Sequence, residues 1–160
     1  MMKSVRHILP IGMLFCLLCL VLAACAVAPS KPEAGYDPQT GEKAAQTAVS
    51  MIGRPYKYRG ESPEGFDCSG LVRYSYLAAG VDAPHGTKEL LRVTKQVDLK
   101  KAKTGDLLFF NERGRRYSHV GIYLDNELFV HAPATGGKVR KESLSDSHWK
   151  KSFIEARRFP

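Results

Sequence analysis

The segment Gly65-Phe66-Asp67-Cys68-Ser69-Gly70-Leu71-Val72 leads from a turn into a helix and sets the register of the helical half of the chain. Ser62-Pro63-Glu64-Gly65, which overlaps its start, is typical of a turn. Small and apolar residues then recur at helical spacing up to Gly80, at Cys68, Leu71, Val72, Ser75 and Ala79. This period predicts a helix that starts at Asp67 or Cys68. Cys68 then lies in the first turn, where free backbone N–H groups and the helix dipole favour a thiolate.

Helical patterns come first along the chain, and strand patterns follow. A helix with its apolar side at Ala45, Ala48, Val49 and Ile52 is predicted to end near Gly53, and a short helix is predicted over 87–93. Strand-like runs follow at 106–110, 117–124, 127–132, 138–142 and 153–158. This order predicts an α+β fold in which N-terminal helices pack on one side of a small antiparallel sheet of about five or six strands.

Two histidines occupy neighbouring strands of one predicted hairpin. Val120 and Ile122 form an apolar face on the first strand, which leaves His119 on the other face; the same alternation places His131 on the second strand. The two histidines share a face only if the hairpin loop holds an odd number of residues. The sequence therefore predicts a three-residue loop, Asp125-Asn126-Glu127. Gly121, two residues after His119, leaves space on the shared face.

The N-terminal segment has the pattern of an export signal. Residues 1–7 include a lysine and an arginine but no acid, and the apolar run that follows, of about 14 residues, is shorter than the roughly 20 residues of a spanning helix. Leu22-Ala23-Ala24-Cys25 resembles the lipobox of bacterial lipoproteins. We therefore expect residues 1–24 to be removed as a lipoprotein signal peptide and Cys25 to be acylated. An ordinary cleaved signal is the alternative.

The rest of the chain is predicted to be a tether and one domain. Residues 25–40 contain Pro29, Pro32 and Pro38 among small and polar residues, which is typical of a tether behind an acylated N-terminus. Residues 41–160 are long enough for one compact domain. The formal net charge of +8 comes with no recognisable basic–aromatic motif, so no nucleic-acid partner is expected. We expect a monomer, anchored by lipid in the bacterial cell envelope, at the outer membrane and facing the periplasm.

Cys68 is the candidate nucleophile. The other cysteines lie within the first 25 residues, so Cys68 has no partner for a disulfide inside the exported domain. A free thiol, with a pKa of about 8.5, needs a lowered pKa or a neighbouring base to react near neutral pH. His119 is the candidate base, and His131 is the candidate for fixing the orientation of the His119 ring. Taken singly, each of these residues is more often a packing residue; together they indicate cysteine catalysis that needs no cofactor.

Several motifs together resemble the NlpC-type cell-wall cysteine peptidases, a family with a compact papain-like fold. The resemblance extends from Ala44 to Phe159. It is carried by Gly53-Arg54-Pro55-Tyr56, Asp67-Cys68-Ser69-Gly70-Leu71-Val72, Thr104-Gly105-Asp106-Leu107-Leu108-Phe109-Phe110, Ser118-His119-Val120-Gly121-Ile122-Tyr123 and Phe129-Val130-His131-Ala132. Trp149-Lys150-Lys151 and Ala156-Arg157-Arg158 resemble the lipoprotein subgroup of murein endopeptidases within this family.

The resemblance implies a peptidoglycan endopeptidase that cuts amide bonds of stem peptides or cross-links, with diaminopimelate as one of the residues involved. It assigns the nucleophile to Cys68, the base to His119 and the polar third residue to His131. It also implies that Tyr56 faces the nucleophile and helps the oxyanion or the substrate. Asp67 and Ser69 are implied to line the peptide-binding side.

Two stretches depart from the pattern of the family. Pro84-His85-Gly86-Thr87 stands where relatives often have Pro-Arg-Ser or Pro-Arg-Thr, and Arg59-Gly60 stands where they often have a pair of glycines. A loop with Arg113, Arg115 and Arg116 precedes the His119 strand. These arginines are candidates for binding the free carboxylates of stem peptides, and a merely solvated loop is the alternative.

Two other classes of function stay open at this point. Cys68, His119 and His131 are potential zinc ligands, although the spacing shows no fourth ligand. The domain is also a candidate for a lipoprotein that binds the cell wall without cutting it.

Overall fold

The computed structural model describes residues 37–112, 114–134 and 137–160. The expectations for the signal peptide, for Cys25 and for most of the tether lie outside these residues. The elements, in chain order, are α2 (Pro38–Ser50), β1 (Glu61–Ser62), β2 (Gly65–Phe66), α3 (Cys68–Ala78), α4 (Thr87–Val93), β3 (Lys95–Val97), the 3₁₀ turn η1 (Leu99–Lys101), β4 (Leu107–Glu112), β5 (Arg115–Tyr123), β6 (Leu128–His131), β7 (Arg140–Ser143), α5 (Ser147–Ser152) and β8 (Phe153–Arg158).

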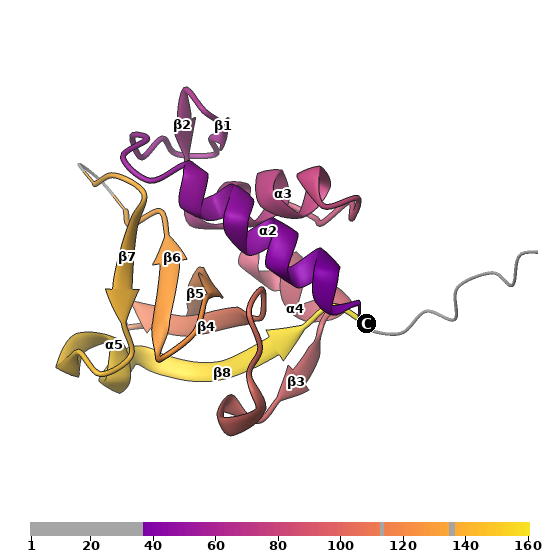
Figure 1. Cartoon of the computed structure of the whole chain (residues 1–160). Helices are drawn as coiled ribbons and strands as arrows, with labels where there is room; N and C mark the ends of the chain where they lie inside the picture. Colours follow the sequence, from indigo (N-terminus) through magenta and orange to yellow (C-terminus); the bar gives the residue numbers. More distant parts are fainter. Residues whose placement is uncertain (1–36, 113, 135–136) are drawn as a thin grey trace, which may run out of the picture. The chain divides into compact units, whose positions relative to one another are not determined.

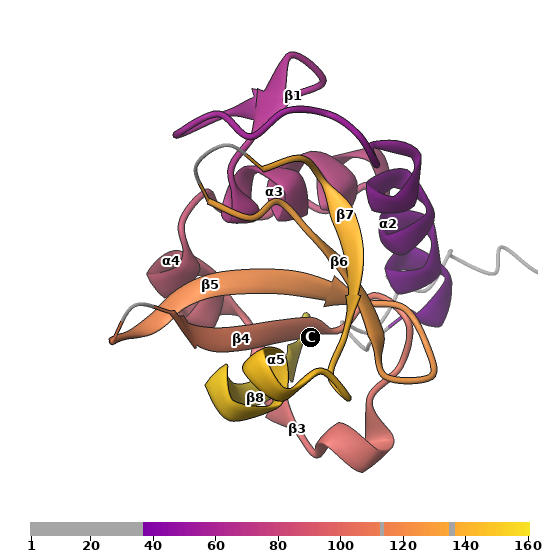
Figure 2. The same cartoon turned by 90° about the vertical axis from the view of Figure 1, so that its left-hand side faces the viewer.

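Six strands form one antiparallel sheet in the order β3-β8-β4-β5-β6-β7. The C-terminal strand β8 lies between β3 and β4, so the end of the domain is built into the sheet. In Figures 1 and 2 the helices α2 and α3 lie together on one side of this sheet, and α5 lies at β4 and β8 on the other side. The predicted α+β fold, with N-terminal helices on a small antiparallel sheet, is confirmed.

Alternating side chains of the sheet enter two separate cores. Leu107 and Phe109 of β4 pack with the helices α2, α3 and α4, in a cluster that includes Ala44, Leu71 and Leu90. Leu108 and Phe110, which alternate with them along β4, point the other way into a second cluster. The other buried residues of this cluster are Phe129, Leu144, Trp149 and Ala156. Both faces of the sheet are therefore covered, as the uninterrupted apolar run of β4 requires.

The helix that carries Cys68 begins where the sequence predicts. Asp67 is its N-cap, because the Asp67 carboxylate accepts a hydrogen bond of 2.7 Å from the backbone N–H of Gly70. Gly70 is required by a close approach of backbone: a Cβ at this position would lie 1.9 Å from the carbonyl oxygen of Gly60. The backbone N–H of Asp67 also donates to that oxygen. The turn before β1 is thus held against the first turn of α3.

The first helix starts earlier than predicted. Pro38 is its first residue and Asp37 its N-cap, so residues 38–40, assigned above to the tether, form helix. Proline suits the first helical position because its missing N–H has no partner there and its φ is already helical. This helix start lies three residues before Gly41, where the domain was expected to begin.

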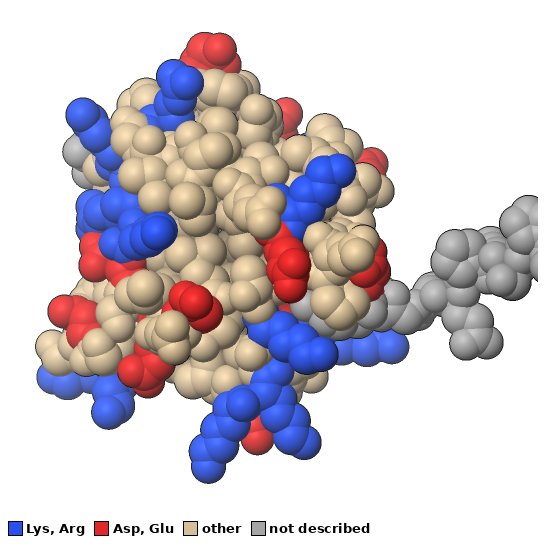
Figure 3. Space-filling model, viewed as in Figure 1, with Lys and Arg blue, Asp and Glu red and all other residues tan. Residues whose placement is uncertain are grey.

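The predictions contain no counterpart for the edge strand β3, the short hairpin of β1 and β2, the 3₁₀ turn η1 and helix α5. In the described part of the chain, no helix is sufficiently long and apolar to cross a membrane. Figure 3 shows lysines and arginines scattered among acidic side chains on the face in view, without a field of one sign.

Candidate active site

Cys68 is the first residue of α3, and its half-buried thiol faces strand β5. The backbone of Val120, the residue after His119, forms a hydrogen bond with the sulfur that lowers the pKa of the thiol. Cys68 and His119 also line the same cavity, which has a volume of about 470 Å³. The packing of α3 against β5 therefore brings together two residues that are far apart in the sequence.

The two histidines share a face of the sheet, as predicted. Ile122 pairs with Val130 and Tyr123 with Phe129, and this register places Gly121 opposite His131. The loop is the three-residue loop expected, with positive φ at Asn126 and Glu127. The Nε2 atom of His119 lies 2.7 Å from Nδ1 of His131. This contact leaves Nδ1 of His119 for the cavity that contains Cys68.

Trp149 of α5 covers both imidazole rings. Its indole stacks on the His119 ring with the centroids 5.7 Å apart, and it meets the His131 ring edge to face at 4.8 Å. His119 and His131 are both buried as a result. The sequence motifs did not predict this contact of Trp149 with the two histidines. The one signal that pointed to Trp149 was that it is the only tryptophan of the chain.

The cysteine and the histidines are uncharged in the resting site. Burial raises the pKa of the Cys68 thiol to about 12, and the nearby charge of Asp67 raises it too. Burial lowers the pKa of His119 to about 4 and that of His131 to about 2. The amides of Cys68 and Ser69 at the helix start do favour the thiolate, but burial outweighs them. The helix start thus favours a thiolate, as expected, but burial has the larger effect and keeps the pKa of the resting thiol high.

A groove runs past Cys68 on both sides. The cavity with Cys68 and His119 shares Tyr56, Tyr58, Cys68 and Ser118 with a cavity of about 530 Å³ that extends towards α4. On its other side it shares Glu112 and Ala134 with a cavity of about 360 Å³ beside α5. An extended chain laid in this groove would pass the Cys68 sulfur near its middle.

Tyr56 is held in place between two distant segments. The Tyr56 N–H donates to the carbonyl oxygen of Gly137, and the next residue, Lys57, donates to that of Phe66, close to the start of α3. Tyr56 lines both of the larger cavities together with Cys68. The structure thus brings Tyr56 to the part of the groove that Cys68 lines.

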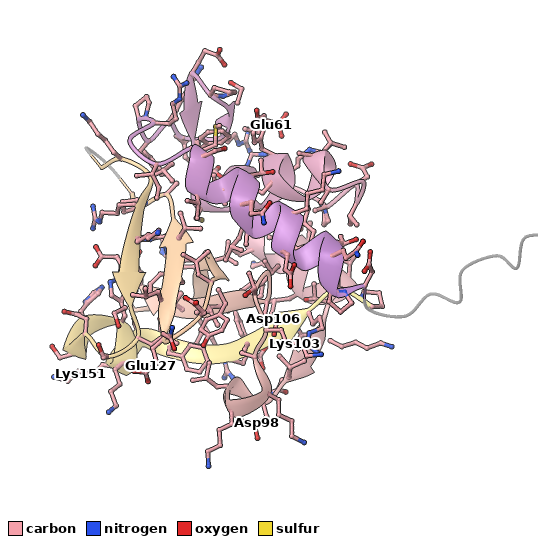
Figure 4. All side chains as sticks on the ribbon, in the orientation of Figure 1. Glu61, Asp98, Lys103, Asp106, Glu127 and Lys151 are labelled. Carbon is pink, nitrogen blue, oxygen red and sulfur yellow. The ribbon has the colours of Figure 1, made fainter. Side chains whose placement is uncertain are left out.

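Asp67 and Ser69 line the cavity towards α4, and His85 lies there with them. Nε2 of His85 is 2.9 Å and 3.0 Å from the two carboxylate oxygens of Asp67, and its Nδ1 is 3.5 Å from Glu61. Figure 4 labels Glu61, on β1 at the end of the molecule near α3. The hydroxyl of Ser69 donates to the same Asp67 carboxylate at 2.9 Å. His85, noted above only as a departure, is thus part of this wall.

Of the described arginines in this loop, one lines the groove. Arg115 lines the cavity of Cys68 and His119, whereas Arg116 lies over the ring of Tyr117 at 5.1 Å. Arg113 lies outside the described residues. In the described ranges, no group of three or more His, Cys, Asp or Glu side chains is arranged to hold a metal ion. His119 and His131 bond each other directly, through Nε2 of the first ring and Nδ1 of the second.

Residues 53–158 match the NlpC/P60 family. A similar protein is the murein DD-endopeptidase MepH of Escherichia coli, 38% identical over 126 residues that cover 73% of this chain and 46% of MepH. Another is the bifunctional muramidase/DL-endopeptidase CwlT of Bacillus subtilis, 34% identical over 71% of this chain and 35% of CwlT. The chain thus spans less than half the length of these curated relatives.

The fold has counterparts among solved structures. A Staphylococcus aureus protein described as similar to a lipoprotein of the NLP/P60 family superposes with a TM-score of 0.69 and 32% sequence identity. The superposition covers 81% of this chain and 45% of that protein.

Proposed function

Because the chain belongs to the NlpC/P60 family, we propose that it is a cysteine endopeptidase that hydrolyses amide bonds in the peptide stems or cross-links of peptidoglycan. One observation carries the proposal: Cys68 and His119 line one cavity, and the far nitrogen of His119 is bonded to His131. The names of MepH and CwlT specify different bonds, DD and DL. We therefore include both the D-alanyl cross-link and the γ-D-glutamyl-diaminopimelate bond.

In the first half of the reaction, the thiol of Cys68 gives its proton to Nδ1 of His119, and the sulfur attacks the amide carbonyl. Since both groups are neutral at rest, this transfer creates a thiolate and an imidazolium together inside the site. The backbone N–H of Cys68 and the side chain of Tyr56 stabilise the oxyanion that forms. His119 then returns the proton to the leaving amine, and an acyl-enzyme thioester remains.

In the second half, water hydrolyses the thioester. Neutral His119 takes a proton from the water, the new hydroxyl adds to the carbonyl, and the sulfur leaves and is reprotonated by His119. His131 stays neutral throughout, and its hydrogen bond at 2.7 Å holds the His119 ring in the orientation that both halves need. All of these steps use groups of the chain and water.

The walls of the groove suit a peptide that carries charges. Arg115, in the cavity of Cys68, is placed for the free carboxylate of a stem peptide. Asp67 and Ser69 line the opposite arm, where His85 holds the Asp67 carboxylate. We propose that these residues contact the peptide on the side away from α5.

We also propose that the protein works as a lipid-anchored monomer in the cell envelope, attached through Cys25 and facing the periplasm from the outer membrane. The lipobox Leu22-Ala23-Ala24-Cys25 supports the anchor, and the peptidoglycan endopeptidases among the relatives support the compartment.

The test is release of peptides from purified peptidoglycan, with the products identified by mass spectrometry. Wild-type protein is expected to release fragments whose masses identify the bond that is cut. Cys68→Ser and His119→Ala are expected to release none, because each removes a chemical step, and circular dichroism checks that both variants remain folded. Substantial release by Cys68→Ser would exclude Cys68 as the nucleophile. Binding to peptidoglycan without release by the wild type would favour a cell-wall-binding role instead.

A further inference from the structure

Glu112 is the carboxylate that lies beside the catalytic face of His119. Its Oε2 is 3.8 Å from Nδ1 of His119, the nitrogen left free by the bond to His131, and its Oε1 is 3.5 Å from Nε2 of His148. A separation of 3.8 Å is too long for a hydrogen bond but short for an interaction between charges. Glu112 also lines the cavity that contains Cys68.

The backbone of Glu112 is fixed by the residue before His119. The hydroxyl of Ser118 accepts a hydrogen bond from the N–H of Glu112 and donates one to its carbonyl oxygen, both at 2.9 Å. The register of β4 against β5 shifts between Phe110 and Glu112, which is typical of a bulge that redirects a side chain. Glu112 is therefore held at the edge of the site by the strand that carries His119.

The hydrogen bond on the other side of the ring brings no charge. His131 is buried and neutral, because burial lowers its pKa to about 2. An aspartate in the place of His131 would stabilise a charged His119 ring with a full negative charge. The neutral imidazole of His131 has no such charge. The proton transfer from Cys68 nevertheless makes His119 a cation in a buried site.

Groups of both signs face His119 from the elements around it. The groups that interact electrostatically with His119, or that line the cavity with it, are Glu112 from β4, Arg115 from β5, His131 from β6, Arg140 from β7, His148 from α5, Cys68 at the start of α3 and Asp67 at the N-cap of that helix. Glu112 has the largest effect of these charges and raises the pKa of His119, whereas Arg140 and His148 lower it. Arg140 is itself bound to Glu142 at 2.6 Å.

We propose that Glu112 is a positioning residue that stabilises the His119 imidazolium formed when Cys68 gives up its proton, and so supplies the negative charge that His131 lacks. The inference rests on the proposed function of Cys68 and His119. Glu112 takes up no proton in the step: the proton moves from the sulfur to Nδ1 of His119 and later to the leaving amine.

The first experiment measures the thiolate without any substrate. The full chain is treated with iodoacetamide over a range from about pH 5 to pH 9, and alkylation of the Cys68 peptide is followed by mass spectrometry. Glu112→Gln is expected to slow alkylation near neutral pH about tenfold, the equivalent of one pKa unit, and the difference is expected to shrink as the pH rises. Glu112→Asp, which keeps the charge, should lie between Glu112→Gln and the wild type.

The matched control is Glu42→Gln, which removes an exposed carboxylate from α2 and is expected to alkylate like the wild type. Thermal unfolding checks that the variants fold; if Glu112→Gln does not, the comparison is made with Glu112→Asp. Alkylation of the folded Glu112 variants at the wild-type rate, with the wild-type pH dependence, would overturn the inference.

The second experiment uses peptidoglycan turnover. Removal of the Glu112 charge lowers the pKa of His119. Glu112→Gln should therefore have a lower kcat, and the acid limb of its pH–rate profile should lie at lower pH than that of the wild type. A purely structural role for Glu112 would lower activity without this shift. If the wild type releases no peptides although Glu112→Gln slows alkylation, the proposed function fails and the role of Glu112 stands. If the wild type cuts and Glu112→Gln keeps its kcat and acid limb, the role of Glu112 fails alone.

Discussion

Nε2 of His119 lies 2.7 Å from Nδ1 of His131, across the neighbouring strands β5 and β6. For Nδ1 of His119 to accept a proton from Cys68, its Nε2 must carry the hydrogen and donate it to His131. His131 then carries its own hydrogen on Nε2, which is buried and has no hydrogen-bond partner among the described residues. The proposed mechanism thus assigns one tautomer to each ring.

We predict that His131→Ala lowers peptidoglycan turnover about 10- to 100-fold, because it removes the acceptor that orients His119. His131→Asn and His131→Gln should recover part of this loss, since an amide oxygen also accepts a hydrogen bond. His119→Ala should be inactive. The rates of peptide release by these variants test the predicted ranking of their activities. Zinc bound in a one-to-one ratio by the purified protein, and lost on substitution of Cys68, of His119 or of His131, would instead indicate a metal site.

Stability is predicted to fall in acid because two buried histidines resist protonation. Burial lowers the pKa of His119 to about 4 in the folded protein, against an ordinary value of 6.5, so above pH 6.5 His119 is neutral in both the folded and the unfolded state. As the pH falls from 6.5 to about 4, His119 takes up a proton in the unfolded state but not in the folded state. The free energy of unfolding therefore falls by on the order of 3 kcal/mol. Urea unfolding at a series of pH values measures this loss. His119→Gln should show a shallower decline; an equal slope would contradict the assignment.

Gly70→Ala is predicted to destabilise the fold by about 1–3 kcal/mol, because its Cβ would meet the carbonyl oxygen of Gly60. The strain falls on the first turn of α3, so turnover should drop as well. Leu77→Ala, at an exposed position of the same helix, should change stability by less than about 0.5 kcal/mol. Thermal and urea unfolding compare the two. Equal effects would mean that the turn before β1 moves aside without cost.

Cys25→Ser is predicted to abolish lipid attachment and to leave the precursor uncleaved or misprocessed. Acylation occurs on the sulfur, and firm membrane binding needs more than one acyl chain. Labelled fatty acid on Cys25, together with membrane fractionation, tests the anchor. Wild-type protein in the soluble extracytoplasmic fraction, with Ala26 or a later residue first, would make residues 1–25 an ordinary signal.

Patterns within single elements were sufficient to predict the local structure around the candidate site. The helical period after Asp67 placed Cys68 in the first turn of α3, because that period depends only on neighbours along one helix. The alternation of β5 and β6 predicted the shared face of His119 and His131 and the length of their loop, because side chains alternate strictly along a strand. Errors arose at weak boundaries, such as Pro38, where a proline suits both a tether and a helix start.

The sequence by itself therefore determined the order of the helix and strands that carry Cys68, His119 and His131, the position of Cys68 on its helix and the pairing of the two histidines. Only the tertiary structure decided the environment of these residues. The cover of Trp149, the approach of Glu112 and the bond of His85 to Asp67 each join segments that are distant along the chain. The charge states of Cys68 and His119 follow from the same packing, because burial penalises a charge by an amount that depends on every neighbour in space.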